Sequence, residues 1–206
     1  MFKIEDISKL RAMTDAGFMD CKKALTETNG DMDKAVAWLR EKGMSASAKK
    51  ADRIASNGRL GFYNHMNLGQ VGVVVEVNCE TDFAAKSERF IELVNNIAMH
   101  IAAAKPLYLS KEEVPANVVA AEKEILTTKA KTEGKPANII EKMVEGGINK
   151  YYKEVCLLEQ EYVKNPDITV AALVNEATLT IGEKLSVRRF TLYAVGEGME
   201  KRNWAE

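Results

Sequence analysis

The sequence predicts an α+β fold: an N-terminal domain of three helices, then an antiparallel three-stranded sheet covered by helices, with a helical hairpin. Three observations predict it. Apolar residues recur at helical spacing in the first forty residues, valines occupy every second position from Val71 to Val77, and two helical stretches meet at a Gly-Lys-Pro turn. The expected parts are a helical domain at 1–43, a basic linker at 44–57, an α+β core at 58–196 that includes the hairpin at 116–152, and a tail at 197–206.

The first forty residues predict three short helices around a very small core. The first stops before Thr14, the second ends near Gly30, and the third is capped by Asp31 and ends at Gly43. Phe18 stands in the first turn between helices. There it either fills the small core or contacts a partner, and the residue pattern by itself favours the core.

The linker is basic. Its bases and those at its borders are Lys42, Lys49, Lys50, Arg53 and Arg59, against one acid, Asp52. A solvated tether is the plainer interpretation, and a docking strip for an acidic partner surface is the alternative. Nucleic acid is less favoured, because no aromatic residue is interleaved among these bases to stack on a nucleotide.

Residues 58–79 predict a β-hairpin whose turn contains Asn67 and Gly69. The apolar period then changes to 3.6, which predicts a helix that Ser87 caps. We expect the apolar side of this helix to cover one face of the sheet, with His100 on the helix flank.

The remaining chain predicts more helices and one strand. Helices at 116–132 and 136–152 form an antiparallel hairpin across a short loop. A last helix runs from about Thr169 to Gly182, and residues 185–195 form a third strand that returns to the β-hairpin.

Composition excludes several classes of protein. With 206 residues, 46% apolar and 29% charged, the chain can bury one ordinary core and a small satellite domain. The net charge of −1 argues against a protein that coats nucleic acid. No apolar run approaches the roughly 20 residues of a membrane span, and acids at the N-terminus argue against a signal peptide. We expect a cytoplasmic protein with no membrane partner.

Motifs for catalysis and cofactor binding are missing. Cys21, Cys79 and Cys156 are too scattered for a disulfide framework or a zinc knuckle, and neither histidine has a second metal ligand at helical spacing. The chain has no phosphate loop and no nucleophile elbow. An enzyme built on Cys79 with Glu80 and Asp82 is a weak alternative, because no general base is placed near the thiol. We expect no metal, no cofactor and no catalysis.

Several motifs resemble bacterial elongation factor Ts. The longest are Leu10–Leu25 (LRAMTDAGFMDCKKAL), Asn78–Phe83 (NCETDF) and Ile97–Ala102 (IAMHIA), and Glu141–Gly146 and Arg188–Phe190 fit the same family. The resemblance covers nearly the whole chain in the expected order.

The resemblance implies a guanine nucleotide exchange factor for elongation factor Tu, the GTPase that delivers aminoacyl-tRNA to the ribosome. Such a factor is not an enzyme. It binds the GDP form, promotes GDP release and is displaced when GTP binds. The motif Thr81-Asp82-Phe83 supplies a wedge, in which Phe83 enters the GTPase beside the magnesium and phosphate site. From the residue pattern without the resemblance, Phe83 would be a core residue that opens its helix.

The resemblance also implies how the chain docks. Its N-terminal part resembles a ubiquitin-associated domain, and the family's contact positions fall on Arg11, Phe18 and Met19. Phe18 stands where many relatives have Met. Ser45 and Ser47 lie in a stretch that the family usually fills with Ala and Lys, so the contacts of this stretch are not carried over.

Two further expectations concern partners. Many relatives contain two copies of the core subdomain, whereas this chain has a single NCETDF segment, so we expect a homodimer in which two copies make the full binding surface. We expect no direct contact with nucleic acid. The alternative function is an adaptor that binds a ubiquitin-like partner through the N-terminal helices, which rests on the Gly17-Phe18 turn and little else.

Overall fold

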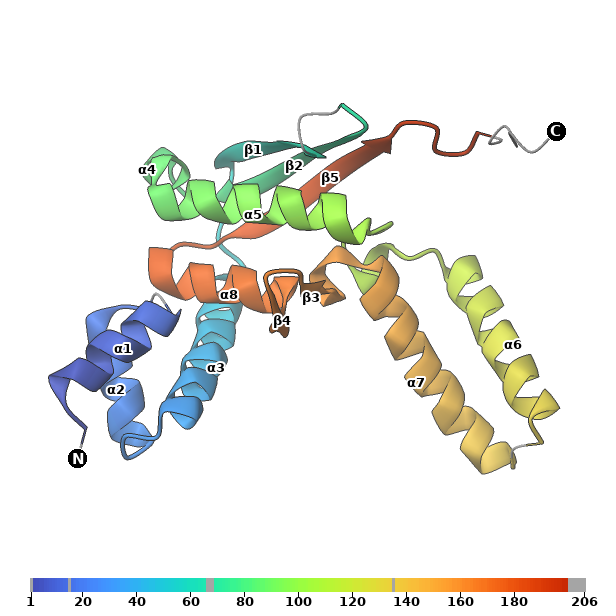
Figure 1. The fold of residues 1–206 in the computed structure, drawn as a ribbon, viewed down its shortest axis with the longest axis horizontal. Helices are drawn as coiled ribbons and strands as arrows, with labels where there is room; N and C mark the ends of the chain where they lie inside the picture. The colour runs from blue at the N-terminus through green and yellow to red at the C-terminus, as the bar shows by residue number, and fades with distance from the viewer. Residues whose placement is uncertain (1, 15, 66–68, 135, 200–206) are drawn as a thin grey trace, which may run out of the picture. The chain divides into compact units, whose positions relative to one another are not determined.

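The structure, a computed structural model, describes residues 2–14, 16–65, 69–134 and 136–199, and it confirms the predicted α+β fold (Figure 1). The chain divides into two compact units, one formed by residues 1–99 with 171–206 and the other by residues 100–170. No helix in the described ranges is long and apolar enough to cross a membrane. The predicted tail lies largely outside the described residues.

The first unit begins with three helices. They are α1 (Ile4–Thr14), α2 (Phe18–Glu27) and α3 (Met32–Lys50). As predicted, the Asp31 side chain caps α3 by accepting a hydrogen bond from the Lys34 backbone N, at 3.0 Å. Their small core is built from Ile7, Leu10, Ala16, Cys21, Ala24, Leu25, Ala35 and Leu39. Phe18 is not among these residues.

The expected helix end at Gly43 is wrong, because α3 continues to Lys50. Gly43 is buried inside the helix, and a Cβ at this position would lie 3.2 Å from the backbone oxygen of Asn175 in α8 (Val170–Ile181). The glycine therefore serves close packing between α3 and α8 and does not end the helix.

The sheet of the first unit has the strand order β1 (Asn57–Asn64), β2 (Val71–Cys79), β5 (Ser186–Ala194), all antiparallel. The predicted third strand thus returns to the hairpin. Gly69 has a φ of +67°, typical of a glycine turn, whereas Asn67, its predicted companion, lies outside the described residues.

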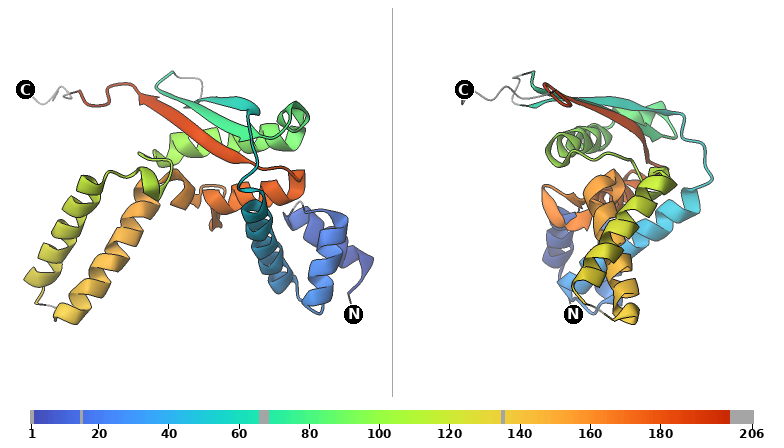
Figure 2. Two further views of the ribbon diagram at one scale, coloured as in Figure 1. Left: turned by 180° about the vertical axis from the view of Figure 1, so that it is seen from behind. Right: turned by 90° about the vertical axis from the view of Figure 1, so that its right-hand side faces the viewer.

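One face of the sheet packs on α5 (Glu88–Ala104), as the pattern predicts (Figure 2). The alternating residues Val73, Val75 and Val77 are buried. The approach is so close that a Cβ on Gly61 of β1 would lie 2.6 Å from Cγ1 of Val94 in α5. No helix in the described part of the first unit lies on the other face (Figure 2).

The second unit contains the predicted helical hairpin, α6 (Ala116–Thr132) and α7 (Ala137–Val155), with α7 running past its expected end at 152. Beside it are two single-turn 3₁₀ helices, Lys111–Glu113 and Leu157–Glu159. A short ribbon of β3 (Glu161–Tyr162) and β4 (Asn165–Thr169) was not predicted.

His100, the first residue of this unit, is hydrogen-bonded to two residues near the other end of the unit. It is fully buried, so the expectation of a flanking histidine is wrong. Its Nδ1 accepts a hydrogen bond from the Val163 backbone N at 3.3 Å, which leaves Nε2 to donate to Oε1 of buried Gln160 at 3.0 Å. The bond to Nδ1 requires the neutral ring, because a protonated histidine has no acceptor for the Val163 N–H. Burial lowers the pKa of His100, and the Gln160 hydrogen bond opposes this in part.

We expect Gly61→Ala to lower the free energy of unfolding by about 1–3 kcal/mol, because the added methyl group overpacks the contact with Val94. Gly72→Ala is the matched control in β2, since its Cβ would meet no atom within 4 Å, and its effect should stay below about 0.5 kcal/mol. Urea unfolding measures both, and equal effects would contradict the close approach of α5.

We expect the protein to lose stability as pH falls below about 6.5, because the unfolded histidine binds a proton that the folded ring, with its lowered pKa, does not. The contribution has a slope of at most about 1.4 kcal/mol per pH unit. Urea unfolding between pH 7.5 and 5.5 should show a shallower dependence for His100→Gln than for the wild type. Parallel curves would show that His100 does not contribute.

Candidate functional site

The predicted wedge lies where β2 changes into a one-turn helix, α4 (Asp82–Lys86). Thr81 is the N-cap, and its Oγ1 accepts a hydrogen bond from the Ala84 backbone N at 3.2 Å. Asp82 receives a hydrogen bond from Lys86 Nζ at 2.7 Å, one turn later. The cap and the ion pair thus define the local geometry of Thr81-Asp82-Phe83.

The Phe83 side chain is exposed, although the two residues that follow it in the chain are buried. Its side chain is 82% exposed, whereas Ala84 and Ala85 beside it are buried. On the strand side, the buried Cys79 thiol donates to the Thr81 backbone oxygen at 3.1 Å. The interpretation of Phe83 as a core residue is therefore wrong, and the outward position implied by the family resemblance is the observed one.

Electrostatics distinguish the Asp82 carboxylate from the Cys79 thiol. The Lys86 ammonium holds the pKa of Asp82 below its ordinary value, so the carboxylate stays charged. Burial raises the pKa of Cys79, so its thiol stays protonated. A protonated thiol that donates to a carbonyl is a poor nucleophile, and this argues against an enzyme built on Cys79.

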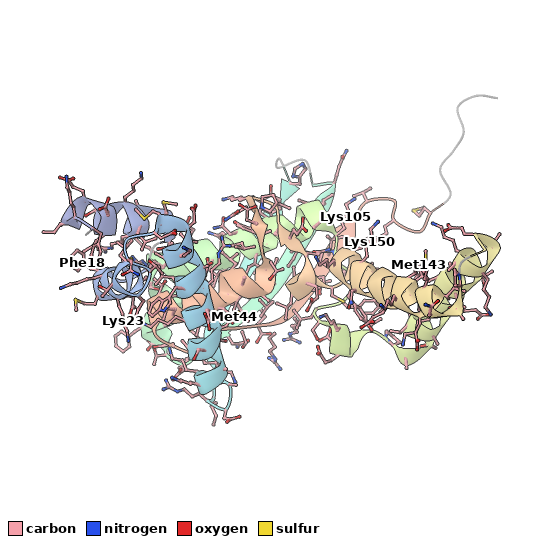
Figure 3. All side chains as sticks on the ribbon, turned by 90° about the horizontal axis from the view of Figure 1, so that it is seen from below. Phe18, Lys23, Met44, Lys105, Met143 and Lys150 are labelled. Atoms are coloured by element: carbon pink, nitrogen blue, oxygen red, sulfur yellow. The ribbon has the colours of Figure 1, made fainter. Side chains whose placement is uncertain are left out.

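The predicted docking residues lie on the first two helices. Arg11 is in the last turn of α1, and Met19 is the second residue of α2. Phe18, labelled in Figure 3, is the first residue of α2. Phe18 is 43% exposed and Met19 is 70% exposed, so the interpretation of Phe18 as a core plug is wrong. These side chains are available to a partner, on elements separate from α4.

The linker is anchored, not a solvated tether. After α3 ends, the backbone oxygens of Ala51 and Arg53 accept hydrogen bonds from Lys184 Nζ, at 2.5 and 2.8 Å. Lys50 Nζ donates to the Thr178 backbone oxygen at 3.4 Å. The segment therefore holds a defined position relative to the core of its unit.

Sequence reasoning missed the residues that hold the wedge from the far end of the chain. Glu183 follows α8 and accepts hydrogen bonds from Thr81, and the neighbouring Lys184 bonds to Glu80. The one available signal was an acid directly after Gly182, the glycine that ends a predicted helix. That signal does not name a partner about a hundred residues away.

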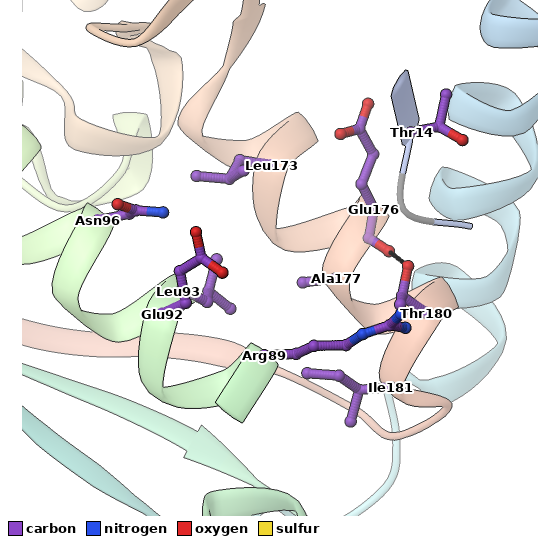
Figure 4. Close-up of a pocket in the computed structure, with 10 residues that line it drawn as sticks. All are labelled: Thr14, Arg89, Glu92, Leu93, Asn96, Leu173, Glu176, Ala177, Thr180 and Ile181. Atoms are coloured by element: carbon purple, nitrogen blue, oxygen red, sulfur yellow. Dashed lines mark hydrogen bonds between the residues drawn. The ribbon is translucent and has the colours of Figure 1, made fainter. Parts of the chain in front are cut away.

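A pocket of about 190 Å³ opens elsewhere in the first unit, between α5 and α8 (Figure 4). Its lining includes Arg89, Glu92 and Asn96 from α5. Glu176 of α8 also lines it, and burial raises the pKa of this carboxyl although Arg40 lies 3.3 Å away. None of the predicted partner-binding residues lines this pocket.

Comparison with known proteins gives one consistent result. The family model described as elongation factor TS matches residues 5–197. Proteins named elongation factor Ts are similar over most of their length. Identity is 56% over 196 residues with that of Geobacter sulfurreducens, covering 95% of this chain and 90% of the relative. It is 55% over 208 residues with that of Acetivibrio thermocellus, covering 100% of this chain and 96% of the relative.

Proposed function

This chain belongs to the elongation factor Ts family, and on that premise we propose that it is a guanine nucleotide exchange factor for elongation factor Tu in translation elongation. It changes a binding equilibrium and catalyses no chemical step of its own. The observation that supports the proposal is the exposed ring of Phe83, which lies beside buried residues that are held by hydrogen bonds of Cys79 and Thr81. Such a rigid backbone lets the side chain enter a partner while the local structure keeps its conformation.

In the proposed mechanism, Phe83 enters the GDP-bound GTPase beside its magnesium and phosphate site. Burying one Phe yields about 1.5–3 kcal/mol, which is enough to drive a local rearrangement but not to hold a complex. Arg11, Phe18 and Met19 supply docking contacts, because two of them are large apolar side chains that the free protein leaves exposed.

Exchange then follows from reciprocal coupling. If the factor weakens GDP binding a thousandfold, about 4 kcal/mol, GDP weakens binding of the factor equally. The released nucleotide leaves an empty complex, and GTP displaces the factor from it.

We also propose that two copies pair through the uncovered face of the sheet. The strand register places Leu60, Phe62, Val74 and Tyr193 on this face, and all four are exposed. Phe62 is 67% and Tyr193 is 74% exposed. A cross-strand group of this kind in a chain with a single core subdomain fits a second copy of the same sheet, which buries the apolar groups of both copies at once.

Replacing Phe83 with Ala should slow the maximal rate of GDP release from elongation factor Tu by about 10–100-fold, the factor expected for losing one buried ring. Stopped-flow release of a fluorescent GDP, titrated with the factor, measures it. Met19→Ala should instead raise the concentration that gives half-maximal release, because it weakens docking.

Leu107→Ala serves as the control for the Phe83 experiment, since Leu107 is also an exposed apolar side chain and has no proposed contact. It should release GDP at the wild-type rate. A Phe83→Ala protein that folds normally and matches the wild type would refute the wedge.

Light scattering at micromolar concentration should give twice the chain mass of 22.8 kDa for the wild type and a single chain mass for Phe62→Glu, which places a charge in the apolar interface. Ile125→Glu, an equivalent change at an exposed apolar residue of α6, should stay dimeric. A monomeric wild type would rule out the pairing.

A further inference from the structure

We propose that Glu183 is a positioning residue that fixes the direction of the Phe83 ring, and that Glu80 contributes a second set of hydrogen bonds to the same contact. The inference rests on the proposed exchange function and extends it to residues outside the wedge motif. We call the hydrogen-bonded pairing of residues 80–81 with residues 183–184 the wedge clamp.

The Glu183 carboxylate holds the junction of strand and helix with three hydrogen bonds. Its Oε2 accepts from the backbone N of Glu80 at 3.1 Å and from that of Thr81 at 3.0 Å. Its Oε1 accepts from Thr81 Oγ1 at 2.6 Å. Bonds from N–H groups to a charged carboxylate are stronger than those between neutral groups.

The Thr81 hydroxyl transmits this contact to α4. It donates to Glu183 and accepts from the Ala84 backbone N at 3.2 Å, so one oxygen is shared by the clamp and the helix cap. The helix has five residues, too short to be stable without such contacts. The direction of Phe83, the second residue of α4, therefore depends on what holds Thr81.

Glu80 closes the other half of the clamp. Its Oε1 accepts from the Lys184 backbone N at 2.6 Å and from Arg53 Nη1 at 3.2 Å, and its backbone oxygen accepts from Asn57 Nδ2 at 2.9 Å. The Lys184 backbone N–H holds the pKa of Glu80 below its ordinary value, so the Glu80 carboxylate remains charged.

The clamp also reaches the segment that follows the docking helices. Lys184 donates through Nζ to the backbone oxygens of Ala51 and Arg53, just beyond the end of α3. The segment that follows α3 and the wedge are thus bonded to the same two residues, 183 and 184. Holding Thr81 in this way orders the wedge before a partner binds, which reduces the ordering cost of inserting the ring.

Glu183→Ala tests the inference in the full chain. We expect the maximal rate of GDP release to fall about tenfold or more, because a small misplacement of an inserted group has a large kinetic effect. The half-saturating concentration should stay at its wild-type value, since the docking residues are untouched. Glu183→Gln keeps one oxygen acceptor and should retain an intermediate rate, and Glu124→Ala, an exposed acid on α6, should have no effect.

A double-mutant cycle with Phe83→Ala separates positioning from other roles. If Glu183 acts through the ring, Glu183→Ala causes no further loss once Phe83 is Ala. An undiminished further loss would overturn the inference, and so would wild-type release by folded Glu183→Ala or Glu183→Gln. Wild-type release by Phe83→Ala is a different result, because it removes the wedge itself and leaves nothing for the clamp to position.

Discussion

The packing of α5 against one face of the three-stranded sheet is the constraint on which the first unit depends. Gly61 lets the helix approach β1 to a distance that no Cβ would permit, and buried valines of β2 complete the contact. This packing makes the sheet a rigid support for the junction between β2 and α4. It also concentrates the burial on one face, and the opposite face keeps exposed Phe62 and Tyr193.

In the proposed activity, the exposed ring at the end of β2 and the exposed apolar residues of the docking helices have different tasks. A rigid strand end presents a single exposed ring, and one ring contributes enough free energy to shift a local equilibrium in a partner without making the complex irreversible. Exposed apolar side chains on separate helices add affinity. Exchange needs both contributions. A factor that bound the nucleotide-bound and the nucleotide-free partner equally tightly would not change the affinity of the partner for nucleotide.

The first unit is assembled from both ends of the chain, which explains why its contacts are non-local. β5 pairs with β2 across more than a hundred residues, and Glu183 reaches Thr81 over a similar separation. Closing the long loop between β2 and β5 has an entropic cost that grows slowly with loop length. The pairing of the two strands can offset this cost, and the neighbouring contacts then form without a second loop closure. The wedge clamp forms beside that pairing, where the strands have already met.

The sequence by itself determined the α+β class and the order of the main helices and of the three strands of the sheet, because periodicity and capping residues are local properties of the chain. It placed Ser87 and Asp31 at helix starts and Gly182 at a helix end for the same reason. It missed the short ribbon of β3 and β4, and it identified the wedge motif only through the family resemblance. The tertiary structure decided which way Phe83 and Phe18 face, that Gly43 packs inside α3, and that His100 is buried. Exposure depends on which distant elements cover a residue, and no local pattern records that Glu183 lies against Thr81.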